Sequence, residues 1–139
     1  NSVLRVKNAA TKMLVPGTLW AEYHREVGEI MTAELLALGL LDPADVKNQD
    51  PNKPAYKKYF MHGTSHHIGL DTHDYGALKT PMKAGMVFTV EPGIYIPEEG
   101  IGIRLEDNVV IQEKGDPINL MAHIPITIAE IEALMNGEI

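Results

Sequence analysis

The chain has 139 residues, a formal net charge of −7 and no cysteine. This length fits one domain, and a content of 45% hydrophobic and 22% charged residues is typical of a globular protein. An acidic chain without a basic run gains little from phosphate contacts, so we expect no nucleic-acid partner. The lack of cysteine excludes disulfides, thiolate metal sites and cysteine nucleophiles. No apolar run approaches the ~20 residues of a membrane helix, so we expect no membrane partner and a cytoplasmic location.

Two amphipathic helices are predicted in the first forty residues. The first carries apolar residues at helical spacing between Val3 and Leu14 and ends at Pro16. The second begins after Thr18, whose hydroxyl suits an N-cap, and Gly39 ends it. Its apolar stripe consists of Leu19, Tyr23, Val27, Ile30, Met31, Leu35 and Leu38. We expect such stripes to cover one face of a sheet.

The rest of the chain changes from helical to extended patterns. A short third helix is predicted at Asp42–Pro43, because proline is tolerated at the first helical position. Residues 50–54 are predicted to form a loop, and residues 58–61 a strand. Further strands are predicted at residues 86–91, 93–96, 102–105 and 108–112, and a closing helix at 130–135. Helices first and strands afterwards predict an α+β fold with helices packed on a curved, mainly antiparallel sheet.

Four short strings carry the residues that suit hydrolytic chemistry. They are His-Gly-Thr-Ser-His at 62–66, Gly-Leu-Asp-Thr-His-Asp at 69–74, Val-Glu-Pro-Gly at 90–93 and Arg-Leu-Glu-Asp-Asn at 104–108. Four of the six histidines fall between positions 62 and 73. Neutral imidazole and ionised carboxylate supply nitrogen and oxygen ligands to a divalent ion. The strings therefore indicate a hydrolytic metal site.

Two glutamates, Glu91 and Glu106, lie inside apolar, strand-like runs. An inward-pointing carboxylate on a strand is costly unless it pairs with or binds a cation. A single glutamate in a strand more often faces solvent, and a single histidine is more often a structural or surface residue. The joint pattern favours the metal site over these alternatives, because Pro-Gly follows one glutamate and Asp-Asn the other.

The four strings, in this order and spacing, resemble those of the pita-bread metallopeptidases, and most of all aminopeptidase P, the Xaa-Pro aminopeptidase. The tract at 60–74 and the run at 102–107 carry the resemblance almost residue for residue. Prolidases, which act on dipeptides ending in proline, are similar but usually carry glycine where Ser65 stands. Methionine aminopeptidases share the histidine and glutamate positions in different surroundings. The resemblance implies a pita-bread fold and peptide substrates with proline at the second position, from which the N-terminal residue is removed.

The resemblance also implies a metal centre. His66, Glu91 and Glu106 would bind metal, and Glu106 would bridge two divalent ions. Two cations held close together lower the pKa of a bridging water, and the resulting hydroxide attacks the peptide bond. An oxygen-rich site suits Mn²⁺, with Co²⁺ or Zn²⁺ as alternatives. The family's site has two further aspartates on a strand hairpin that has no match in these 139 residues. We therefore expect this chain to bind at most one ion, weakly, and to be inactive alone.

The resemblance assigns catalytic roles to His62, His73, Glu91 and Arg104. Glu91 would handle the proton of the attacking water, in addition to binding metal. His73 would steady the developing oxyanion near the scissile carbonyl, and His62 would line the substrate site. Arg104 would orient the carboxylate ligands. His67 is expected to be a neighbour of the ligand and not a ligand itself.

The chain opens on Asn1 rather than Met and enters an amphipathic pattern at once, which indicates a partial chain. Without the aspartate hairpin and the family's N-terminal domain, residues 1–139 would form the C-terminal portion of the catalytic domain. A chain that lacks these covering parts exposes apolar surface, so we expect a homo-oligomer. Two other functions stay open, a prolidase and a non-catalytic pita-bread module that binds proteins. Retention of all three metal-binding side chains argues against the second.

Overall fold

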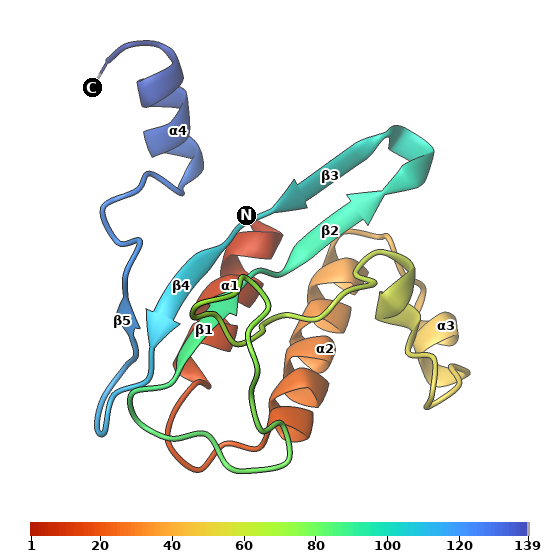
Figure 1. Ribbon diagram of the computed structural model, residues 1–139. Helices are drawn as coiled ribbons and strands as arrows, with labels where there is room; N and C mark the ends of the chain where they lie inside the picture. The colour runs from red at the N-terminus through yellow and green to blue at the C-terminus, as the bar shows by residue number, and fades with distance from the viewer. Residues whose placement is uncertain (139) are drawn as a thin grey trace.

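The computed structural model describes residues 1–138, in which helices pack against antiparallel strands (Figure 1). The helices are α1 (Ser2–Lys12), α2 (Trp20–Ala37), α3 (Pro43–Lys47) and α4 (Ile128–Met135), with 3-10 turns η1 (Ala55–Lys58) and η2 (Pro97–Glu99). The strands are β1 (Val87–Val90), β2 (Gly93–Ile96), β3 (Ile101–Arg104), β4 (Asp107–Val110) and β5 (Ile118–Asn119). Within these residues, β1, β4 and β5 form one antiparallel sheet, and β2 pairs with β3 in another.

Strands β1 to β4 form one interrupted hairpin, whose two halves lie in different sheets. In the first sheet Val90 of β1 faces Asp107 of β4, and in the second Gly93 of β2 faces Arg104 of β3. One register therefore runs through both sheets, although the ladder is broken between β1 and β2 and, on the returning strand, between β3 and β4 (Figure 1). The residues at this break face each other across the hairpin.

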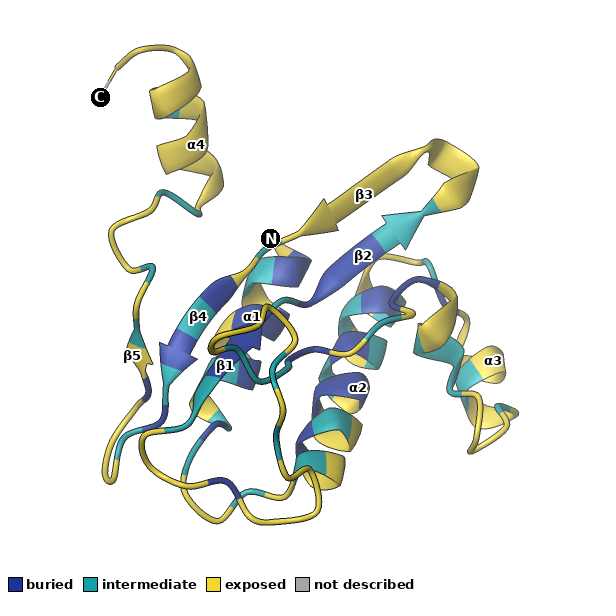
Figure 2. Cartoon of the chain, in the orientation of Figure 1, coloured by how far each residue is buried: buried dark blue, intermediate teal, exposed yellow. Residues whose placement is uncertain are grey.

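The core lies between the two long helices and the first sheet (Figure 2). Helix α1 packs against both α2 and β1. Apolar side chains with at most 1% exposure repeat every three or four positions along the helices and every second position along the strands. They include Val6, Ala10, Leu14, Tyr23, Val27, Met31, Leu35, Phe88, Val90, Val109 and Ile111. The predicted stripes on the two helices thus form most of the core, but Leu19 and Leu38, at the two ends of the second stripe, are exposed.

Strand β3 and helix α4 are mostly exposed (Figure 2). Ile101 and Ile103 of β3, like Leu134 of α4, keep about half of their surface exposed. Local interactions define the start of α4, where the N–H of Thr127 donates to the carboxylate of Glu130 at 2.9 Å in a capping box. None of the helices in residues 1–138 combines the length and the apolar character that a bilayer crossing needs.

The start of α2 differs from the sequence-based prediction. Thr18 does not cap the helix, because its hydroxyl donates to the carbonyl of Met13 at 3.0 Å. The N-cap position belongs to Leu19, which makes no side-chain cap hydrogen bond. Helix α3, in contrast, begins at Pro43 as predicted, and the carboxylate of Asp42 caps it by accepting from the N–H of Ala44 at 2.7 Å.

The prediction of a strand at residues 58–61 is wrong. Lys58 ends η1, and the residues that follow form a turn and an irregular segment. Tyr59 and Phe60 are both buried, whereas a strand with one covered face would alternate buried and exposed side chains. The structure also differs at the C-terminal end, where the short strand β5 was not predicted and α4 begins two residues before Glu130.

Candidate metal centre

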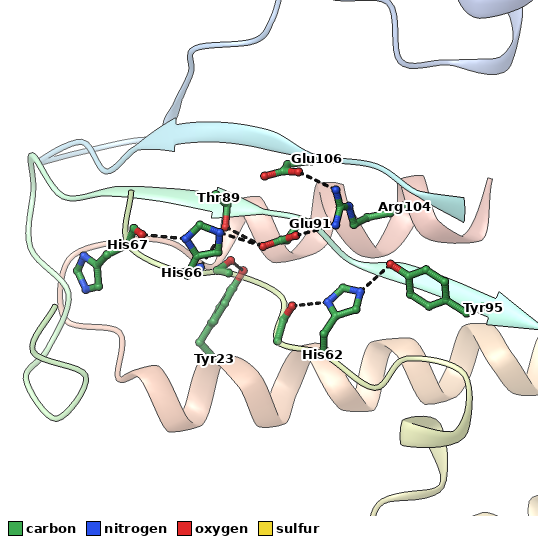
Figure 3. Close-up of polar contacts among 11 residues, drawn as sticks. Tyr23, His62, His66, His67, Thr89, Glu91, Tyr95, Arg104 and Glu106 are labelled. Atoms are coloured by element: carbon green, nitrogen blue, oxygen red, sulfur yellow. Dashed lines mark hydrogen bonds and ion pairs between the residues drawn. The ribbon is translucent and has the colours of Figure 1, made fainter. Parts of the chain in front are cut away.

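The three proposed metal ligands, His66, Glu91 and Glu106, converge at the interruption of the hairpin (Figure 3). One ligand atom of each lies within 4.8 Å of the ligand atoms of the other two. Glu91 directly follows β1 and Glu106 directly precedes β4, so the common register places the two carboxylates opposite each other. Within residues 1–138, no other group of three or more His, Asp or Glu side chains converges in this way.

Backbone hydrogen bonds hold the histidine-rich segment against β1. The N–H of Glu91 donates to the carbonyl of Thr64 at 2.7 Å, and the N–H of Thr89 donates to the carbonyl of His66 at 3.0 Å. The segment therefore runs antiparallel to β1 as an irregular edge. This pairing brings the imidazole of His66 beside the carboxylate of Glu91.

When the imidazole of His66 is neutral, its unprotonated nitrogen faces Glu91. Its Nδ1 lies 2.8 Å from the carbonyl oxygen of His67, which only accepts hydrogen bonds, so Nδ1 carries the proton. In the neutral ring Nε2 then carries a lone pair, and it lies 3.2 Å from Oε1 of Glu91. Two acceptors at this distance repel each other unless they share a cation. The chemistry of the donor set therefore fits a divalent metal ion.

Arg104 connects the two carboxylates. Its Nη1 lies 3.6 Å from Oε2 of Glu91, and its Nη2 lies 3.5 Å from Oε2 of Glu106 (Figure 3). Like charges at opposite positions of neighbouring strands destabilise a sheet. The guanidinium offsets part of this repulsion and holds both carboxylates toward the same side of the hairpin.

A pocket of about 380 Å³ adjoins the ligands, and His62, His73, Glu91 and Arg104 all line it. These are the four residues to which the resemblance to aminopeptidase P assigns catalytic roles. The ring of His73 lies with its centroid 4.1 Å from that of His66. The remaining lining residues are Gly63, Ser65 and His66. The structure thus brings all the predicted site residues around one pocket, except that Glu106 lies beside it.

His62 is held by hydrogen bonds at both ring nitrogens (Figure 3). Nδ1 lies 2.8 Å from the carbonyl oxygen of Gly63 and must donate, since a carbonyl only accepts. Nε2 then accepts from the hydroxyl of Tyr95 at 2.8 Å. The ring also meets Phe60 edge-on, with centroids 5.0 Å apart. His62 therefore belongs to a rigid, partly aromatic wall of the pocket.

His67 lies apart from the three ligands (Figure 3). Its ring packs against Phe88 at a centroid distance of 4.4 Å and stacks on Trp20 at 6.1 Å. Burial lowers the pKa of His67. A Cβ at Gly76 would lie 1.8 Å from this ring, so the loop passes close to it only because position 76 is glycine. This placement is that of a packing residue.

Three hydroxyl groups near the site are not among the residues predicted from the sequence. Tyr95 bonds to His62, and the hydroxyl of Tyr23 lies 2.7 Å from that of Ser65. Burial raises the pKa of Tyr23. The third hydroxyl belongs to Thr89, which lies two positions before Glu91 and so on the same face of the strand. Alternation along β1 could have indicated Thr89, whereas no local signal indicates the two tyrosines.

Comparison with known proteins agrees with this geometry. Residues 1–113 match the model of metallopeptidase family M24. The chain belongs to that family. The Xaa-Pro aminopeptidase of Haemophilus influenzae is 42% identical over 146 residues, which cover 96% of this chain and 33% of that protein. Membership of a metallopeptidase family implies a divalent metal.

Solved structures of aminopeptidase P share the fold of this M24 chain. Pseudomonas aeruginosa aminopeptidase PepP has a TM-score of 0.85 and 37% identity, over 98% of this chain and 33% of that chain. Escherichia coli aminopeptidase P with the inhibitor Pro-Leu has a TM-score of 0.83 and 41% identity, over the same shares of the two chains. The expected α+β, pita-bread fold is confirmed. The chain spans about a third of the length of the relatives it matches.

Proposed function

We propose that the protein carrying this chain is a metal-dependent aminopeptidase that hydrolyses the bond between an N-terminal residue and a following proline. The observation that carries the proposal is the convergence of His66, Glu91 and Glu106 beside a pocket lined by His62 and His73. Family M24 membership supports metal-dependent peptide hydrolysis. The similar proteins named Xaa-Pro aminopeptidase support peptides with proline at the second position as substrates.

The complete centre in this proposal holds two divalent ions, with Mn²⁺ preferred over Co²⁺ or Zn²⁺. Within residues 1–138 the converging donors are one imidazole and two carboxylates, which suit one ion, and an oxygen-rich set favours Mn²⁺. Further carboxylates would come from the rest of the protein, of which residues 1–139 form the C-terminal portion of the catalytic domain. The chain's span of a third of its relatives supports this division. When bound, the ions supply a nucleophile at neutral pH and polarise the scissile carbonyl.

The chain's own residues move the proton and hold the reacting groups. The carboxylate of Glu91 takes the proton of the attacking water and returns it to the proline nitrogen, which leaves as a secondary amine. The bond before proline has no N–H, so recognition relies on the shape of the pocket and on the carbonyl oxygen. His73 donates a hydrogen bond to the oxyanion that develops there. Arg104 keeps the carboxylates of Glu91 and Glu106 in place through its two contacts.

The decisive experiment replaces Glu91 by glutamine in the full-length protein that carries this sequence. Glu91→Gln keeps the shape of the side chain but removes its charge and its basicity, so turnover of an Xaa-Pro-Yaa tripeptide should fall by at least ~10²–10⁴-fold. Glu98→Gln is the matched control, because Glu98 is an exposed residue of η2 whose ion-pair partner is Lys58. Unchanged turnover in Glu91→Gln would contradict the mechanism.

Choice of substrate separates the alternatives. An aminopeptidase cleaves Xaa-Pro-Yaa peptides, whereas a prolidase prefers Xaa-Pro dipeptides without a third residue. A non-catalytic binding module cleaves neither substrate when loaded with Mn²⁺, and that outcome would refute the proposed activity. His73→Ala should lower turnover by about 10²–10³-fold at unchanged metal content, since it removes an oxyanion donor and no ligand.

A further inference from the structure

We propose that the hydroxyl of Thr89 is a positioning group that fixes His66 and Glu91 in a single metal-binding geometry. This inference rests on the proposed metal site and adds a residue that contacts neither pocket nor substrate. Thr89 lies in the middle of β1, is 1% exposed and has its side chain on the face that carries Glu91. Its hydroxyl is therefore enclosed by protein and has few partners available.

Two hydrogen bonds of this hydroxyl reach two different ligands (Figure 3). Oγ1 accepts from the backbone N–H of His66 at 3.0 Å. Because the N–H can only donate, the single proton of the hydroxyl stays free for another acceptor. That acceptor is Oε1 of Glu91, at 3.3 Å. One oxygen atom of Thr89 thus connects the backbone of His66 to the carboxylate of Glu91.

The contact selects one oxygen of the Glu91 carboxylate. Oε1, which accepts from Thr89, is also the oxygen that lies 3.2 Å from Nε2 of His66. Oε2 faces Nη1 of Arg104 at 3.6 Å. The terminal torsion of a glutamate has broad preferences of its own, so these opposite partners decide how the carboxylate plane is turned. Thr89 directs Oε1 toward the imidazole, where the two donor atoms can share an ion.

Packing and strand formation do not require the hydroxyl. Valine has the same shape as threonine and an equally favourable preference for strands, so it would fill the position in β1. What threonine adds at this buried position is the pair of polar contacts with His66 and Glu91. Residues that orient metal ligands typically change metal affinity or activity by about 10–100-fold when they are replaced.

The test uses the full-length protein with Mn²⁺ as the probe. Calorimetric titration of the metal-free protein should show that Thr89→Val weakens Mn²⁺ binding by about 10–100-fold, whereas Thr89→Ser, which keeps the hydroxyl, binds nearly as tightly as the wild type. The matched control is Thr32→Val, because the hydroxyl of Thr32 donates to the carbonyl of Gly28 at 2.8 Å within α2. This control should leave Mn²⁺ affinity unchanged.

Urea unfolding of the metal-free variants separates positioning from stability. Equal Mn²⁺ affinity in Thr89→Val and the wild type would overturn the proposal, even if Thr89→Val were less stable. Failure of Thr89→Ser to restore affinity would also overturn it, since the hydroxyl would then not be the cause. Should Thr89→Val not fold, Thr89→Ala and Thr89→Ser differ by the hydroxyl alone and give the same comparison. A wild-type protein that binds no Mn²⁺ would instead refute the proposed metal site, and this inference with it.

Discussion

A buried ion pair between Lys7 and Asp107 links helix α1 to the strand beside the proposed metal site. Lys7 lies on α1 and Asp107 on β4, and each side chain is only 6% exposed. Asp107 directly follows the proposed ligand Glu106, and the amide of Asn119 on β5 donates to its Oδ2 at 2.9 Å. Because α1 and β4 lie at opposite ends of the sequence, this pair fixes the strand that positions Glu106 relative to the core.

We predict that Lys7→Met lowers the free energy of unfolding of the metal-free protein by about 3 kcal/mol. Methionine keeps most of the length and the apolar stem of lysine, so the change removes little more than the ammonium group. Removing one partner of a buried ion pair typically costs about 3–5 kcal/mol, because the remaining charge is uncompensated. Asn119 still donates to Asp107, which puts the expected cost at the lower end. Since a typical protein is stabilised by only about 5–15 kcal/mol, the loss would be large.

Urea unfolding followed by far-ultraviolet circular dichroism measures this loss. The double variant Lys7→Met/Asp107→Asn should regain most of it, because no buried charge is left and the new amide still accepts from Asn119. A loss below about 1 kcal/mol in Lys7→Met, no more than an average substitution causes, would refute the reasoning. A double variant no more stable than the single variant would refute it as well.

Three further outcomes follow from particular contacts. Tyr23→Phe should lower the free energy of unfolding by about 1 kcal/mol, because it leaves the buried hydroxyl of Ser65 without its partner at 2.7 Å; unchanged stability would count against that contact. Burial, with a smaller contribution from Lys57, lowers the pKa of His24 from 6.5 to about 4. The stability contributed by neutral His24 is therefore complete above pH 6.5 and is lost as the pH falls toward 4, so His24→Asn should flatten the decline of the urea midpoint between pH 7 and pH 4. The isolated 139-residue chain should self-associate through exposed β3 and α4, and a monomeric mass by light scattering at high concentration would contradict this.

Periodicity predicts the two long helices because one face of each is buried along most of its length. On α2 the residues Tyr23, Val27, Met31 and Leu35 are all 0% exposed, and Gly39 ends the helix with a φ of 70°. Such a pattern is local, so it can be read without knowing what covers the helix. The sequence also contains a signal for the start of α4, because Thr-Ile-Ala-Glu at 127–130 has the spacing of a capping box.

Local patterns fail where distant contacts decide the conformation. Tyr59 and Phe60 look like part of a strand, but both are buried, and the carbonyl of Tyr59 accepts from the N–H of Tyr95 at 2.9 Å. Thr18 suits an N-cap, yet its hydroxyl donates to the carbonyl of Met13, the residue that follows the preceding helix α1. In both cases a partner from another element replaces the one that the local sequence suggests.

The metal ligands can be predicted from the sequence by their residue types. The residues that hold these ligands in place can be predicted only in part. The strings that contain His66, Glu91 and Glu106 indicate the chemistry, because imidazole and carboxylate in strand-like runs are costly without a cation. Thr89 follows from strand alternation once Glu91 is assigned to the inner face. Lys7 gives no comparable signal, since it reaches its buried partner on β4 only through the tertiary fold.

The hairpin register explains why the metal-free site is destabilised by repulsion among its ligands. It also explains why residues outside the pocket are needed to hold the ligands in place. Glu91 and Glu106 face each other, and like charges in that arrangement destabilise a sheet. Arg104 approaches both at 3.5–3.6 Å, which is too long for a strong hydrogen bond, so it offsets the repulsion only in part. Nε2 of His66 adds a third acceptor. Because the backbone holds these acceptors together before an ion binds, an ion that binds gains the free energy of relieving their repulsion. Changes that let the acceptors move apart, at Thr89 or at the ion pair between α1 and β4, should therefore weaken metal binding without touching a ligand.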